Sequence, residues 1–367
     1  MVSTGKLELR MVWDGETVRG IEVKSVRPKA YQLLHGRTPD NAVQFVPMLF
    51  SVCGKAQHAA AMAAVAAAQQ RELPQADALE RRVTCEAMQE HLWRLLLDWP
   101  KLLGQKLEQE QFVRWHGELN GVAAGHGDAA GLLAELPRVL LGMPLEEWWR
   151  LGSYGKLEAW WRGGNGLLAP LFAALAQRED EMEFAAVNAP CELLPQQTAV
   201  VVQEIYAGHL DQEFAAMPHH EGWPMETGAL TNWHGLPLLQ EVLRERPCRL
   251  FARLLARLAD LLRAAEVLVH GNGQARIDAV AVGKHAGLAL VRTARGMLLH
   301  HVRIEMGRVA KYLIVAPTEW NFHPRGALAS GLEGLKGRDA ERLMNIARAH
   351  VLSLDPCVEY GIEIAHA

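Results

Sequence analysis

The sequence has little of what marks a disulfide-stabilised, membrane-spanning or nucleic-acid-binding protein. Its five cysteines are scattered singly without a Cys-x-x-Cys pair, so neither a disulfide framework nor a zinc site is indicated. The longest apolar run, residues 59–68, is alanine-rich and too short to span a bilayer. The net charge of −4 gives no reason to expect a nucleic-acid or membrane partner. No signal peptide is recognisable, so we expect a cytoplasmic location.

What is present is enough chain to bury a large core. Half of the 367 residues are apolar and 22% are charged, which is ordinary for a globular protein. Two alternating runs, residues 7–13 and 18–26, flank Asp14-Gly15 and predict a β-hairpin. No repeat or low-complexity linker appears, and residues 163–165 are the one weak boundary candidate. We therefore expect a single domain over residues 1–367.

Long helices are predicted between sheet elements near both ends of the chain, which defines an α+β fold. One helix runs from about residue 54 to 70, and a second begins at the N-cap Asp77 and stops at Pro100. Residues 106–190 are mainly helical. Further strands are predicted at 199–206, 288–291, 298–304 and 309–315, and a last helix at 339–351.

Residues 249–265 have the pattern of a strong amphipathic helix. Leucines at helical spacing make its apolar stripe. Its arginines are expected to be largely solvated: Arg249, Arg253, Arg257 and Arg263.

A cysteine close to the C-terminus follows an unusual dipeptide, Asp355-Pro356. Proline fixes its own φ and lacks a backbone donor, so Cys357 is expected on a stiff turn. A thiolate held in this way is a good ligand for a soft metal. A lone cysteine is more often a buried structural residue, so Cys357 alone does not define a site.

Four separated stretches, read together, resemble the large subunit of NiFe hydrogenases. The first, similar to the family's N-terminal block Arg-x-Cys-Gly-x-Cys-x-x-x-His, comprises Arg19-Gly20-x-Glu22, Arg37-x-Pro39-Asp40 and Cys53-Gly54 with His58. The second is Glu226-Thr227-Gly228-Ala229-Leu230, and the fourth is Asp355-Pro356-Cys357. The third joins Ala294-Arg295-Gly296 and His300 to Pro317-Thr318-Glu319-Trp320-Asn321-Phe322-His323-Pro324-Arg325. Their order and rough spacing hold from end to end, so the resemblance implies a large-subunit-like fold for the whole chain.

The departures from this pattern concern the metal ligands. The family holds nickel and iron on four cysteines, two in each terminal block. Here Ala56 and Tyr360 stand where the second cysteine of each block should be, and Glu363 replaces a histidine. Tyrosine is a poor substitute for thiolate at a soft metal site, so no stable nickel–iron pair is expected. The chain ends soon after these residues, and we expect no cleavable C-terminal tail.

These departures resemble hydrogenase accessory proteins of the HupK/HoxV kind. That resemblance implies a non-catalytic scaffold that carries the Fe(CN)2(CO) fragment transiently during assembly of the hydrogenase active site. It implies Cys53 and Cys357 as the iron ligands, with Arg295, His58 and Glu22 near them. The implied partners are a maturation chaperone, an iron–sulfur scaffold protein and the hydrogenase large-subunit precursor.

Two other functions remain open at this stage. One is a nickel-dependent hydrogenase-like enzyme with a reduced ligand set, and the other is a metal-free protein that docks maturation chaperones.

The histidine cluster His219-His220-Glu221 is expected to be an ordinary loop, because adjacent side chains point in different directions on most backbones. His300 and His301 lie on a predicted strand, so at most one of them can face a site.

Overall fold

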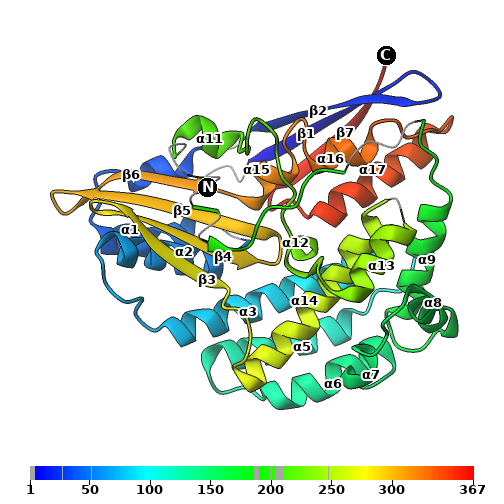
Figure 1. The fold of residues 1–367 in the computed structure, drawn as a ribbon, viewed down its shortest axis with the longest axis horizontal. Coiled ribbons are helices and arrows are strands. Elements are labelled where there is room, and N and C mark those ends of the chain that lie inside the picture. Colours follow the sequence, from blue (N-terminus) through cyan, green and yellow to red (C-terminus); the bar gives the residue numbers. More distant parts are fainter. Residues whose placement is uncertain are drawn as a thin grey trace.

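The hairpin that opens the chain and the strand that ends it form one sheet. The computed structural model describes residues 5–26, 28–50, 52–185, 190–198, 201–202, 206, 210–246 and 248–367. β1 (Lys6–Trp13) pairs antiparallel with β2 (Val18–Val26), which confirms the predicted hairpin. β7 (Glu359–His366) pairs parallel with β1 from Lys6 to Trp13. The first and last strands of the chain therefore lie side by side (Figure 1).

A second sheet is an antiparallel meander of β3 (Ile277–Gly283), β4 (Ala286–Thr293), β5 (Gly296–Glu305) and β6 (Arg308–Val315). β4 to β6 confirm the predicted strands, whereas β3 was not predicted. The alanine-rich helix α2 (Gly54–Ala68) packs directly on this sheet (Figure 1). A Cβ at Gly287 would lie 2.1 Å from the Ala64 carbonyl oxygen, so this close approach requires glycine.

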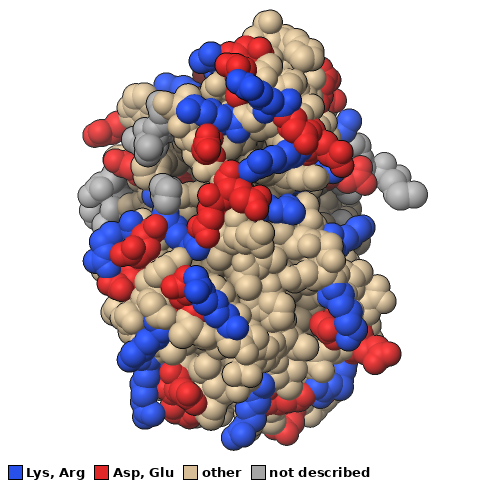
Figure 2. Space-filling model, turned by 90° about the vertical axis from the view of Figure 1, so that its right-hand side faces the viewer, with Lys and Arg blue, Asp and Glu red and all other residues tan. Residues whose placement is uncertain are grey.

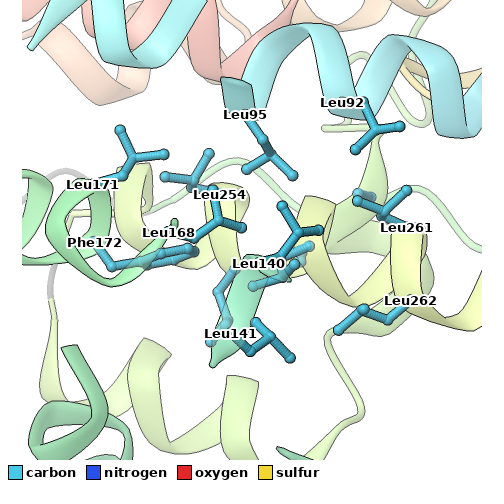
Figure 3. Packing of buried hydrophobic residues seen from close by; sticks show 14 of the residues in the cluster. Leu92, Leu95, Leu140, Leu141, Leu168, Leu171, Phe172, Leu254, Leu261 and Leu262 are labelled. Atoms are coloured by element: carbon cyan, nitrogen blue, oxygen red, sulfur yellow. The ribbon is translucent and has the colours of Figure 1, made fainter. Parts of the chain in front are cut away.

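The middle of the chain is helical, as predicted. In order, its helices are α3 (Ala76–Trp93), a π-helical turn (Arg94–Asp98), α4 (Trp99–Leu102), α5 (Gln109–Ala124), α6 (Ala129–Leu141), α7 (Leu145–Trp148), α8 (Tyr154–Gly163), α9 (Ala169–Asp180), α12 (Ala229–Trp233), α13 (Pro237–Glu245) and α14 (Leu250–His270). Leucines from several of these helices converge on a common core, among them Leu95, Leu140 and Leu254 (Figure 3).

Two details of α3 differ from the prediction. The N-cap is Gln75 rather than Asp77, which instead lies in the first turn. Pro100 does not stop the helix, because the π-helical turn before it relaxes the backbone and α4 continues through it. The Leu96 carbonyl, which lies four residues before Pro100, accepts a hydrogen bond from the Glu108 N–H instead.

The arginines of α14 are the main error of the sequence-based reading. Arg249, Arg253 and Arg257 are not solvated: their side chains are 16%, 6% and 5% exposed and pair with buried carboxylates. Only Arg263, at 37%, is well exposed. The helix is buried on nearly all sides, and its charged positions face partners that lie elsewhere in the chain.

The remaining elements connect the sheets to the helical part. They are a short 3₁₀-helix (Ala30–Leu34), α1 (Pro39–Leu49), α11 (Gln212–Ala216), α15 (Pro317–Asn321), α16 (Ala327–Leu332) and α17 (Ala340–Leu354). α17 confirms the predicted last helix, with Asp339 as its N-cap. The predicted strand at 199–206 falls largely outside the described residues. The prediction of a single domain stays a prediction.

The surface carries charges of both signs. On the face shown in Figure 2, basic and acidic side chains alternate over the upper half, and a broad uncharged area occupies the lower centre. No patch of a single sign dominates this face, in keeping with the small net charge. In the parts of the chain that the structure describes, no helix is both long and apolar enough to cross a bilayer.

Candidate functional site

Cys53 and Cys357 come from opposite ends of the chain and line the same cavity. Cys53 is the N-cap residue of α2, and Cys357 lies in the short segment between α17 and β7. The cavity has a volume of about 390 Å³ and mainly apolar walls, including Tyr31, Phe50 and Ile314. Burial is the main cause that raises the pKa of the Cys53 thiol to about 12, and the neighbouring Cys357 contributes in the same direction. The two sulfurs are therefore electrostatic neighbours.

Cys357 is positioned by a buried threonine. The Cys357 backbone N–H donates to Thr318 Oγ1 over 3.3 Å, and the same hydroxyl lies 3.3 Å from Cys357 Sγ. Thr318 belongs to α15 and is 1% exposed. Asn321, one turn later, donates to the Thr227 carbonyl and accepts from the Thr227 N–H. The hydrogenase-like motifs at 226–230 and 317–321 thus brace one another beside the thiol.

Cys53 is positioned by the start of α2. Glu86 accepts hydrogen bonds from the backbone N–H groups of Lys55 and Ala56 over 2.9 and 2.8 Å, which fixes the first turn of the helix. Gln57 Nε2 lies 3.5 Å from Cys53 Sγ, because residues four apart share a helix face. Ala56, where the resembling family has its second cysteine, is buried in the core and offers no ligand.

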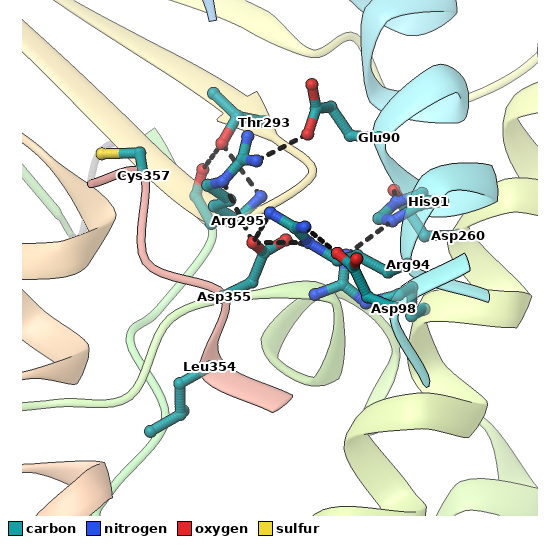
Figure 4. Close-up of polar contacts among 12 residues, drawn as sticks. Glu90, His91, Arg94, Asp98, Asp260, Thr293, Arg295, Leu354, Asp355 and Cys357 are labelled. Atoms are coloured by element: carbon teal, nitrogen blue, oxygen red, sulfur yellow. Dashed lines mark hydrogen bonds and ion pairs between the residues drawn. The ribbon is translucent and has the colours of Figure 1, made fainter. Parts of the chain in front are cut away.

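Asp355 is the centre of a buried cluster of arginines beside Cys357 (Figure 4). It is 1% exposed, and its carboxylate lies 2.7 Å from Arg94, 3.1 Å from Arg257 and 3.3 Å from Arg295. Burial alone would raise its pKa, but these three guanidinium groups hold it far below its usual range. The residue adopts φ 53°, a left-handed conformation that ends α17 and turns the chain toward Cys357.

Arg295 connects this cluster to the thiols. Its guanidinium is 4% exposed and donates to Glu90 over 2.5 Å. Burial works to lower its pKa, yet Asp355, Glu90, Cys357 and Cys53 together raise it. Arg295 and Cys357 also line a second cavity, of about 970 Å³. The structure therefore brings Arg295 to the two cysteines, as the sequence comparison implied.

Two other predicted residues are not brought to the thiols. Glu22 lies on β2 with a side chain 62% exposed, and it pairs with Arg10 across the hairpin. His58 follows Cys53 by five positions, whereas residues that share a helix face are three or four apart. Burial and the nearby Arg82 lower the pKa of His58. Neither residue lines the two cavities that contain Cys357. Glu22 and His58 therefore lie apart from the cavities that the two cysteines line.

Three further residues of the C-terminal block, Tyr360, Glu363 and His366, lie on β7. Tyr360 is 40% exposed at the cavity shared with Arg295. Glu363 lies within 3.6 Å of Arg10, and the ring of His366 packs on Trp13. Among the described residues, no three or more His, Cys, Asp or Glu side chains are grouped so that they could hold a metal ion, and this search includes the His219-His220-Glu221 loop.

Sequence reasoning missed Thr318, Gln57 and the buried partners of Asp355. Thr318 was part of a recognised motif without an assigned role. Gln57 had a usable signal, since it is one helical turn from Cys53. Arg94 and Arg257 gave none, because their partner Asp355 lies 261 and 98 positions away along the chain.

Solved structures with the same fold are hydrogenases. The reduced Ni-Fe-Se hydrogenase from D. vulgaris Hildenborough matches with a TM-score of 0.59 at 15% sequence identity, over 94% of each chain. At this identity the likeness concerns the fold alone. Residues 243–362 match the family model described as nickel-dependent hydrogenase. The fold is thus that of a hydrogenase large subunit, with helices and two separate sheets.

Proteins of similar sequence point to one particular family among those with the hydrogenase large-subunit fold. The hydrogenase expression/formation protein HoxV of Cupriavidus necator is 31% identical, over 93% of this chain and 92% of its own. HupK of Rhizobium leguminosarum bv. viciae, described in the same words, is 29% identical over 95% and 93%. The chain belongs to this family of hydrogenase expression/formation proteins.

Proposed function

We propose that this protein acts in hydrogenase maturation as a non-catalytic scaffold that carries the Fe(CN)2(CO) fragment on Cys53 and Cys357. One observation carries the proposal: the two cysteines, 304 positions apart in sequence, line one cavity, and Cys357 is close enough to raise the pKa of Cys53. Thiolates are preferred ligands of low-valent soft metals. The names of HoxV and HupK as expression/formation proteins support a role in assembly rather than in turnover.

The ligand set suits a cargo that must be passed on. Iron that already carries cyanide and carbon monoxide needs only a few further ligands, so two thiolates hold it without enclosing it. A competing thiolate on an acceptor protein can then replace Cys53 or Cys357 in turn. Ala56 and Tyr360 supply no further sulfur, so we expect no nickel on this protein.

Arg295 provides hydrogen-bond donors close to the iron ligands. Its guanidinium is nearly buried and electrostatically coupled to both sulfurs. A planar guanidinium donates well to the nitrogen of bound cyanide. Asp355 and Glu90 hold the group in place, so Arg295 would recognise the fragment by its cyanides while the cysteines bind the iron.

The proposed partners are those that give and receive such a fragment. We expect a maturation chaperone and an iron–sulfur scaffold protein to deliver it, and a hydrogenase large-subunit precursor to accept it, all in the cytoplasm. A hydrogenase-like enzyme and a metal-free docking protein are the competing functions, and both differ from the carrier in metal content.

Infrared spectroscopy with metal counting separates these functions. The protein is purified without oxygen from its native host, and iron and nickel are measured on the same sample. We expect CN and CO stretching bands with iron and without nickel. Stoichiometric nickel would indicate the enzyme, and a sample without bands or metal, from cells with active hydrogenase, would leave the docking function.

Cysteine variants test the ligands. Cys53→Ser and Cys357→Ser are expected to lose the bands and to abolish hydrogenase maturation in the host. Cys191→Ser is the matched control, since Cys191 is also partly buried and its thiol donates a hydrogen bond to the Pro224 carbonyl over 3.1 Å. Unimpaired maturation with either of the first two variants would exclude the carrier proposal.

A further inference from the structure

A line of hydrogen bonds leads from Cys53 into the second sheet through three buried side chains. Gln57 Nε2 lies 3.5 Å from Cys53 Sγ, and Gln57 Oε1 lies 2.8 Å from His300 Nε2. His300 Nδ1 in turn lies 2.8 Å from the hydroxyl of Tyr312. Gln57 is 3% exposed, and both His300 and Tyr312 are fully buried. The line therefore joins the cavity at α2 to β5 and β6 in the protein interior.

Tyr312 sets the direction of these hydrogen bonds. Within the described chain, His300 Nδ1 is the one hydrogen-bond partner of its hydroxyl. A buried O–H without an acceptor is strongly disfavoured, so the hydroxyl donates and Nδ1 accepts. Burial lowers the pKa of His300 to about 3, so the ring is neutral and carries its proton on Nε2. Nε2–H then donates to Gln57 Oε1, which leaves the amide N–H of Gln57 facing the sulfur.

The opposite arrangement is excluded by the same groups. If the Gln57 oxygen faced Cys53, its amide nitrogen would have to donate to His300 Nε2. His300 would then carry its proton on Nδ1 and donate to Tyr312. The hydroxyl proton of Tyr312 would be left without an acceptor in the core. The line thus has one satisfied orientation, and Gln57 presents a donor to Cys53.

We propose that Gln57, held in place by His300 and Tyr312, is a positioning residue that hydrogen-bonds the Cys53 sulfur while that sulfur binds iron. This inference rests on the proposed carrier function. An N–H···S hydrogen bond draws charge from the sulfur and so weakens the iron–sulfur bond. Cys357 has a different neighbour, the Thr318 hydroxyl, which lies 3.3 Å from its sulfur. The amide of Gln57 therefore acts on the bond between Cys53 and the iron.

The infrared spectrum of the iron-loaded protein tests this directly. In Gln57→Leu the sulfur keeps more charge, the iron donates more to carbon monoxide, and the CO band shifts to lower wavenumber than in the wild type. Transfer of the fragment to an excess of a small competing thiol is expected to slow about fivefold, which is the usual effect of one hydrogen bond.

Tyr312→Phe removes one oxygen and should shift the band in the same direction by less. Thermal unfolding monitored by circular dichroism shows whether Gln57→Leu folds. If that variant does not fold, Tyr312→Phe still tests the inference. His301→Leu is the matched control: His301 is the next residue of β5, faces the opposite side and is 5% exposed. Its band should stay at the wild-type position.

The outcomes separate the two proposals. Wild-type bands that do not move in Gln57→Leu and Tyr312→Phe would overturn the role of Gln57 and leave the carrier function standing. Bands that move equally in His301→Leu would overturn it as well, because the shift would then reflect general loosening of the sheet. A wild type without bands would overturn the carrier function and this inference together.

Discussion

Asp355 offers the sharpest test of how the site is held together, through the substitution Asp355→Asn. The asparagine keeps the size of the side chain and removes its charge. It also tolerates the left-handed φ of 53° at this position, which alanine would not. The change therefore isolates the electrostatic contribution of the carboxylate from backbone strain.

The expected loss in the free energy of unfolding follows from the partners that each arginine retains in Asp355→Asn. Arg94 keeps its contact with Asp98, and Arg295 keeps Glu90. Arg257 has no second carboxylate among the described residues, and its side chain is 5% exposed. Leaving such a charge buried and unpaired costs about 3–5 kcal/mol, so we expect the free energy of unfolding to fall by about that amount.

Urea denaturation of the wild type and the variant measures this loss. Asp98→Asn is the control, since Asp98 contacts the same Arg94 but its side chain is 28% exposed, and its loss should cost about 1 kcal/mol or less. Equal effects of the two substitutions would refute the reasoning, because the cluster would then contribute no more than a surface ion pair.

The pH dependence of Asp355→Asn provides a second check. The three guanidinium groups depress the folded-state pKa of Asp355, so its stabilising contribution is complete above the pKa of an unfolded aspartate, about 4. The contribution is lost as the pH falls below that value. The stability difference between wild type and variant should therefore be constant near neutrality and shrink in acid.

Two further predictions concern other parts of the molecule. Thr318→Val removes the acceptor for the Cys357 N–H and should lower the free energy of unfolding by about 1 kcal/mol in denaturant titrations. Burial raises the pKa of Glu179 from 4.5 to about 7. The hydrogen bond from the Phe251 N–H and the charge of Arg246 lower this pKa but do not offset the effect of burial. Stability should therefore fall as the pH rises from 4.5 to about 7, and Glu179→Gln should remove this slope in unfolding curves.

Local patterns in the sequence were sufficient for much of the fold. Alternation around Asp14-Gly15 defined the hairpin, helical periodicity located α14, and helix-favouring composition located α2 and α17 within a few residues. These elements form because their own residues favour them and leave one face to bury. That Cys53 and Cys357 lie at one site could be predicted only through the resemblance of four motifs. No local sequence signal of either cysteine points to the other.

Only the tertiary structure decided which polar groups are buried and with what partner. The arginines of α14 have the spacing of a solvated face, yet Arg253 meets Glu226 and Arg257 meets Asp355 in the interior. β7 becomes a strand by pairing with β1, which lies at the other end of the chain. A buried charged side chain needs an oppositely charged partner, and a strand needs a neighbouring strand for its backbone hydrogen bonds. Both partners here come from distant parts of the chain, so long-range packing decides them rather than the local sequence.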